Sequence, residues 1–70
     1  MSAMYWVDYQ HLSDGGMVCH GTITLYAAAA KSMKRADLNA ATINARKRAK
    51  ARLAKMGFRH PRVTRVQCVG

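Results

Sequence analysis

The hydrophobic and polar positions of the first 26 residues predict a β-hairpin. Residues 4–12, MYWVDYQHL, are rich in the aromatic and β-branched side chains that favour a strand. Residues 17–26 alternate with a period of two, which is typical of a half-buried strand. The segment SDGG at 13–16 separates them, and an Asp-Gly pair in that position is the strongest local signal for a hairpin turn. We therefore expect two antiparallel strands.

The same alternation assigns side chains to faces. In the first strand Tyr5, Val7 and Tyr9 share one face, and Trp6 and Asp8 share the other. In the second strand one face collects Met17, Cys19, Gly21, Ile23 and Leu25. The face that no helix covers would show either the tyrosines or the tryptophan. Exposed aromatic rings would suit single-stranded nucleic acid, but core packing is the favoured role for at least half of them in so small a domain.

From residue 38 to residue 56 the apolar positions take the period of a helix. Within about 60° of one direction lie Leu38, Thr42, Ala45, Ala49, Leu53 and Met56. Asp37 or Asn39 could supply the N-cap, so we expect the helix to begin near residue 38. Gly57 is placed to end it as the C′ residue. Residues 27–36 stay open between a short helix, a third strand and a loop.

The last apolar segment, 60–69, contains β-branched residues after a proline and predicts a final strand. That strand could pair with either member of the hairpin. The expected fold class is α+β, in a single domain spanning residues 1–70. It comprises a small antiparallel sheet, made of the β-hairpin and, after one main helix, a C-terminal strand, with the helix packed on one face.

Charge is distributed very unevenly along this chain. Residues 1–30 contain Asp8 and Asp14 but no lysine or arginine, whereas residues 31–70 contain all twelve cations against Asp37. The formal net charge is +9, and glutamate is absent. Such asymmetry indicates an acidic partner: nucleic acid, an acidic protein surface or an anionic membrane. A purely solubilising role is less favoured, because added acids serve solubility better than added bases.

The cations cover the whole exposed arc of the predicted helix and continue on both sides of it. We predict that the following residues bind a partner or nucleic acid: Arg46, Lys47, Arg48, Lys50, Arg52, Lys55, Arg59, Arg62, Arg65, Lys31, Lys34 and Arg35. If most of them share one side, they would attract phosphates with a marked salt dependence. The nearby amide side chains form no known base-reading pattern, so sequence specificity would be weak.

Neither catalysis nor a cofactor is expected. His11, His20 and His60 lack motif neighbours, and the cysteines and histidines lack the paired spacings of a zinc site. Phosphate-binding glycine motifs are absent. A membrane partner is not expected either, because the apolar stripe is mostly alanine and no segment has about 18 consecutive apolar residues. The N-terminus does not resemble a signal peptide, which predicts a cytoplasmic protein with reduced cysteines.

The segments ADLNAATINARKRAKARLAKMGF at 36–58 and RVTRVQCV at 62–69 give the chain a recognisable layout. It resembles small α+β proteins encoded by phages, including those of the anti-CRISPR type. The resemblance covers most of the chain as a layout and transfers no functional residue by position. It implies an inhibitor acting in a bacterial host cell, which docks on an acidic host protein or a CRISPR-type nucleoprotein complex and blocks nucleic-acid binding.

Two hypotheses therefore compete. In the first, which the resemblance favours, the protein is a non-enzymatic inhibitor or accessory factor whose helix binds carboxylates of a host protein, with the arginines as anchors. In the second, the same residues bind DNA or RNA directly. The physical chemistry of the helix is neutral between them. The oligomeric state is also open, between a monomer and a homodimer.

Overall fold

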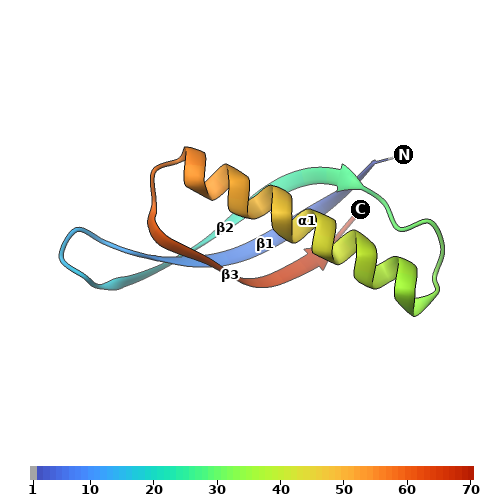
Figure 1. The fold of residues 1–70 in the computed structure, drawn as a ribbon, viewed down its shortest axis with the longest axis horizontal. Helices are drawn as coiled ribbons and strands as arrows, with labels where there is room; N and C mark the ends of the chain where they lie inside the picture. The colour runs from blue at the N-terminus through green and yellow to red at the C-terminus, as the bar shows by residue number, and fades with distance from the viewer. Residues whose placement is uncertain (1) are drawn as a thin grey trace.

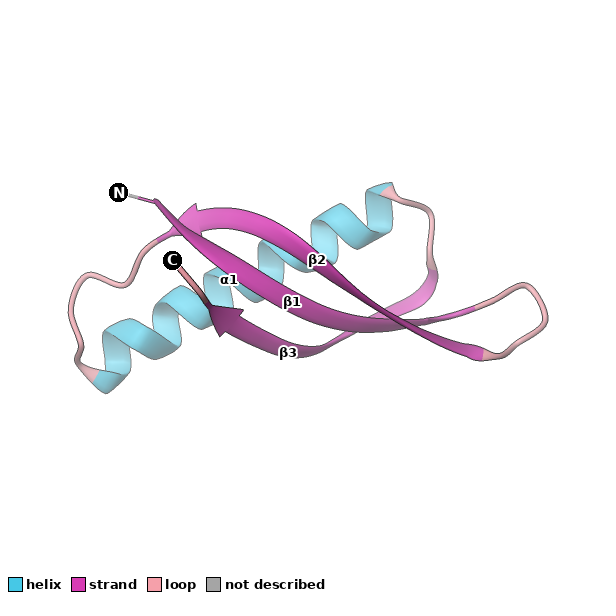
Figure 2. Ribbon diagram, turned by 180° about the vertical axis from the view of Figure 1, so that it is seen from behind, coloured by secondary structure: helices cyan, strands magenta, loops and turns pink. Residues whose placement is uncertain are grey.

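The computed structural model describes residues 2–70, which form three strands and one helix (Figure 1). The elements are β1 (Ser2–Leu12), β2 (Val18–Ala28), α1 (Arg35–Lys55) and β3 (Arg59–Cys68). The strands form one antiparallel sheet in the order β2-β1-β3. Helix α1 crosses one face of the sheet, and the view from behind shows the other face uncovered (Figure 2). The predicted α+β fold is confirmed.

The hairpin forms as predicted. β1 and β2 pair without interruption from Ser2↔Ala28 to Leu12↔Val18. In the turn, the Gly16 amide donates to the Ser13 carbonyl at 2.9 Å, and Gly16 has a φ of 81°. Glycine adopts that left-handed conformation at little cost. The turn therefore fixes a register that places Tyr5 and Tyr9 on the same face as Leu25.

Strand β3 pairs with β1, so β1 is the central strand and β2 and β3 are the edges. The pairing contains two register shifts, one between Asp8 and Tyr9 and the other between Gln10 and Leu12. Thr64 is the extra residue at the first shift, and its hydroxyl donates to the Asp8 carbonyl at 3.1 Å. Such bulges change which side chains of a strand share a face.

The predicted start of the helix was wrong by about one turn. Helix α1 begins at Arg35, and its N-cap is Lys34, whose side chain makes no capping hydrogen bond within the described residues. Asp37 lies inside the first turn, where its carboxylate accepts a hydrogen bond from the Ser32 hydroxyl at 2.5 Å. A negative charge there stabilises the positive end of the helix dipole. Asn39 also lies within the helix.

The uncertain segment 27–36 has three parts. β2 continues to Ala28, residues 29–34 form a loop, and the helix follows. At the other end Met56 is the C-cap, and the Gly57 amide donates to the Ala54 carbonyl at 3.1 Å with a φ of 80°. Gly57 is therefore the C′ residue, as predicted.

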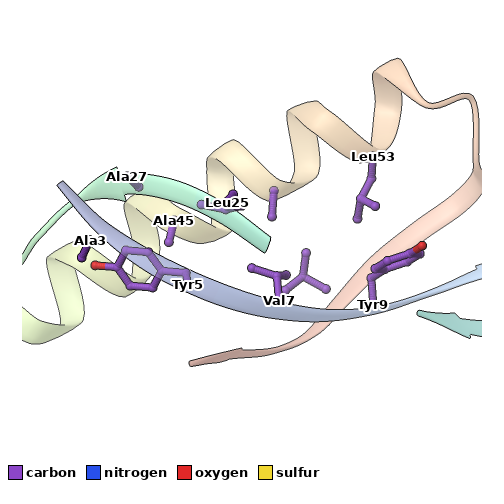
Figure 3. Packing of buried hydrophobic residues seen from close by; sticks show 10 residues of the cluster. Ala3, Tyr5, Val7, Tyr9, Leu25, Ala27, Ala45 and Leu53 are labelled. Carbon is purple, nitrogen blue, oxygen red and sulfur yellow. The ribbon is translucent and has the colours of Figure 1, made fainter. Parts of the chain in front are cut away.

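The core lies between α1 and the covered face of the sheet (Figure 3). Ala45, Ala49 and Leu53 are fully buried on the helix, and the two alanines let it approach the strands closely. The sheet contributes Ala3, Tyr5, Val7, Tyr9, Leu25, Ala27 and Val63. Three members of the predicted helical stripe are not in the core: Thr42 is half-buried, Leu38 is 39% exposed and Met56 is 51% exposed. Leu38 lies in the first turn of α1, and Met56 is its C-cap. The helix crosses the sheet diagonally, so its two ends extend beyond the central part of the sheet (Figure 1).

Tyr5 gives the fold a testable dependence on pH. Its side chain is buried, and its hydroxyl donates to the Ala28 carbonyl at 3.1 Å. Burial, and secondarily the charge of the Cys68 thiolate, raise the pKa of Tyr5 above its ordinary value near 10. The unfolded chain therefore loses this proton first as the pH rises. The stability associated with neutral Tyr5 is complete below about pH 10 and declines above it.

We expect the free energy of unfolding to fall more steeply in the wild type than in Tyr5→Phe between about pH 9 and pH 11. Urea titrations followed by circular dichroism at several pH values would measure both slopes. The phenylalanine variant keeps the buried ring and lacks the ionisable hydroxyl. Identical slopes would show that Tyr5 ionisation does not contribute.

Candidate nucleic-acid interface

The twelve predicted binding residues do not share one side of the molecule. Six of them lie on α1, at positions 46–55, on the layer that covers one sheet face. Arg59, Arg62 and Arg65 lie on β3 and belong to the opposite, uncovered face. Lys31 and Lys34 lie in the loop before α1, and Arg35 is its first residue. The twelve cations therefore form three groups, and the three arginines of β3 are separated by the sheet from the cations of α1.

Two of the helix arginines are held by the edges of the sheet. The Nη1 group of Arg46 donates to the Val63 carbonyl on β3 at 3.2 Å. The Nη1 group of Arg52 donates to the Thr24 carbonyl on β2 at 3.0 Å. The two side chains thus reach opposite edge strands, because at 100° per residue Arg46 and Arg52 lie on opposite flanks of the apolar stripe. Because each stabilises the docking of the helix, neither is a clean probe of binding.

The remaining helix cations form the outward surface of α1, which we define as Lys47, Arg48, Lys50 and Lys55. All four side chains are exposed. No acidic residue occurs after Asp37 anywhere in the sequence, so no carboxylate of this region neutralises them. Beside them, a hollow between α1 and β2 is lined by Tyr26, Arg48, Arg52 and Lys55, among others. This surface can attract phosphates or carboxylates from solvent.

The arginines of β3 are aligned by the register shifts. Arg59, Arg62 and Arg65 pair with Leu12, Gln10 and Asp8 respectively. A spacing of three along a regular strand would send Arg62 to the face opposite the other two. Each of the two shifts inserts one extra residue into β3, so all three arginines oppose alternate residues of β1. We call these three residues the arginine column.

Sequence reasoning left open which aromatic rings would be uncovered, and the structure answers it. Tyr5 and Tyr9 are in the core, whereas Trp6 is 48% exposed and lies on the same face as the arginine column. Tyr26, which pairs with Met4 on this face, is 65% exposed. Neither Trp6 nor Tyr26 was among the predicted binding residues. A signal was nevertheless present in the sequence of the second strand: Thr22 and Thr24 are polar and alternate with the apolar residues, which indicates that their face is exposed to solvent.

The histidines and the cysteines all lie on the strands of the sheet. His11 stacks on Phe58 with ring centroids 4.1 Å apart, which is a packing role. Cys19 and Cys68 are both free, and they pair with positions 11 and 5 of β1, far apart along the sheet. Within residues 2–70, no group of three potential metal ligands is found. The helix of this part of the chain is not apolar enough to cross a membrane.

Comparisons with protein-family models, with curated proteins and with solved structures give no match for this chain. The resemblance to phage proteins of the anti-CRISPR type therefore stays a prediction. Function has to be inferred from the geometry and the charge of the chain itself.

Proposed function

We propose that this protein is a non-enzymatic nucleic-acid-binding protein that contacts the phosphate backbone through the outward surface of α1. The observation that supports it is the set of four exposed cations on one helix with no acidic residue among them. Affinity of this kind comes from neutralised phosphates and carries little sequence preference.

The arrangement of charges on α1 is hard to explain by stability. Arg46 and Lys50, and likewise Arg48 and Arg52, are like charges four residues apart, and such pairs destabilise a helix by about 0.2–0.5 kcal/mol each. Replacing some of them by glutamate would relieve this repulsion and keep the helix soluble. A polyanionic partner would neutralise these uncompensated cations on binding, which explains why the sequence keeps them.

Docking on an acidic host protein or a nucleoprotein complex is the competing hypothesis. It uses the same cations, and it rests on the layout resemblance. Direct nucleic-acid binding is favoured here because the uncovered face of the sheet also carries aromatic and cationic side chains together. A surface that binds carboxylates does not require that combination.

A salt titration of binding tests the proposal. The wild-type protein should bind a fluorescein-labelled duplex of random sequence, measured by fluorescence anisotropy, with a slope of log K against log salt of about −3.6 for four phosphate contacts. Affinity should then fall roughly 100-fold between 50 and 200 mM salt. An absence of duplex binding at low salt would reject the proposal and favour docking on an acidic protein.

A further inference from the structure

We infer that the uncovered face of the sheet is a second binding surface, specific for single-stranded nucleic acid. In this inference bases stack on Trp6 and Tyr26 while phosphates follow the arginine column. It rests on the proposed function in assuming a nucleic-acid partner, and it adds a surface on the opposite side from α1 (Figure 2). The face combines the two features that unspecific single-strand binding requires, a cationic track and aromatic side chains.

The two aromatic residues are neighbours across the hairpin. Trp6 pairs with Thr24 and Met4 pairs with Tyr26, so Trp6 and Tyr26 are diagonal neighbours on adjacent strands. Diagonal positions on one face are about 7–8 Å apart, within reach of aromatic side chains. Both rings are exposed and neither belongs to the core cluster, and Tyr26, on the edge strand β2, also lines the hollow beside α1. Large apolar side chains gathered on one exposed face indicate an interaction surface.

The arginine column runs along the same face on the other side of β1. Its members oppose alternate residues of β1, so neighbouring arginines are about 7 Å apart along the strand. Gln67, the partner of Trp6, follows at the next position of the face. A strand of nucleic acid lying along β1 would thus have cations on one side and aromatic rings at one end. Guanidinium groups suit phosphates because they donate in a planar fork.

A second copy of the chain is a poorer occupant of this face. Among the described residues, Asp8 is the acidic side chain of the face, while Asp14 lies in the hairpin turn and Asp37 on α1. Asp8 already accepts a hydrogen bond from the Thr22 hydroxyl at 2.8 Å. Two such faces packed together would bring six arginines against two carboxylates. A polyanion neutralises the column, whereas a copy of the protein does not.

Trp6 is the sole tryptophan, so its fluorescence reports directly on this face. We expect an oligothymidylate of about 12 nucleotides to quench the emission of Trp6, and a random duplex at equal phosphate concentration to quench it much less. In anisotropy experiments near physiological salt, Trp6→Thr should weaken binding of the labelled oligothymidylate about 5- to 150-fold and leave duplex binding unchanged. Arg62→Gln should weaken single-strand binding and reduce its salt slope by about one.

The matched control is Ile43→Thr. Ile43 is 55% exposed, comparable with Trp6, but it lies on α1. This variant should bind single strands like the wild type, and circular dichroism should show that all variants are folded. Unquenched Trp6 fluorescence, or equal loss in Trp6→Thr and Ile43→Thr, would overturn the inference. If duplex binding persisted in that case, the proposed function would survive without the second surface.

A different result would assign the face to a second copy of the chain. The protein would then dimerise with increasing concentration, and Trp6→Thr would abolish the dimer but leave single-strand affinity unchanged. That result would also overturn the inference. If neither single-stranded nor duplex nucleic acid bound at low salt, the inference and the proposed function would fail together. Each outcome therefore identifies which of the two statements is wrong.

Discussion

The double substitution Lys47→Glu and Lys50→Glu is expected to reduce duplex binding at least tenfold near physiological salt, a loss of about 1.4 kcal/mol or more. Both side chains are exposed and belong to the outward surface of α1. Each substitution removes a phosphate contact and puts a repelling carboxylate in its place. The slope of log K against log salt should become shallower by about two.

The same substitution should leave the fold intact or make it more stable. Glutamate and lysine have similar helix propensities. A glutamate at position 50 also replaces a like-charge pair with Arg46 by an attractive one. Opposite effects on binding and on stability distinguish a binding surface from a structural one. Thermal unfolding followed by circular dichroism, alongside anisotropy with the random duplex, measures both.

A reversal elsewhere controls for net charge. Lys31→Glu with Lys34→Glu changes the charge of the chain by the same amount, but at the N-terminal end of α1. If attraction were set only by the overall charge of +9, the two double variants would lose equal affinity. A larger loss for the Lys47 and Lys50 pair would locate the contact on the outward surface. Equal losses would remove the basis for assigning binding to this helix surface.

Most elements of the fold could be predicted because their signals are local. The alternation of β1 and β2 and the Asp-Gly turn define the hairpin within 28 residues, and Gly57 marks the end of α1. The start of α1 was harder to find, because Lys34 offers no side-chain cap. Asp37, which has a favoured capping side chain, lies one turn further on and instead accepts a hydrogen bond from Ser32. The general preference of aspartate for the N-cap position therefore led to a predicted helix start that lies inside the first turn of α1.

The candidate site depended on features that are not local. The twelve cations were identified by type, but their division between two faces follows from the placement of β3 beside β1. The alignment of the arginine column follows from two register shifts between these strands, which a periodicity of two cannot reveal. One sequence signal was present. Pro61 lies inside β3, and proline within a sheet is confined to edge strands, strand starts and bulges.

His60 shows that the second irregularity is a pronounced one. It has a φ of 48°, which is uncommon for a residue other than glycine, and it directly precedes Pro61. The register shift between Gln10 and Leu12 lies opposite this dipeptide. The left-handed residue and the proline thus accommodate the extra residue that brings Arg59 to the same face as Arg62.

Leu53→Ala is expected to have the largest effect on stability of any alanine substitution in α1. Leu53 is fully buried, and it is the large apolar side chain among the helix residues of the core (Figure 3). Truncating such a leucine costs about 2–5 kcal/mol, because transfer free energy is lost and a cavity is left. A domain of this length has a total stability of roughly 3.5–10 kcal/mol. The variant should therefore lose a large fraction of the stability of the domain and unfold at a clearly lower temperature than the wild type.

Leu38→Ala provides the matched comparison, because it is the same substitution on the same helix. Leu38 is 39% exposed, so its truncation should cost less than about 1 kcal/mol. Urea unfolding followed by circular dichroism measures both free energies, and a shared m-value would show that the unfolded states are comparable. Ala45 and Ala49 hold α1 close to the sheet but offer little volume to bury. The docking of the helix, and with it the cationic outward surface, thus depends mainly on Leu53, and equal losses for the two leucines would contradict that dependence.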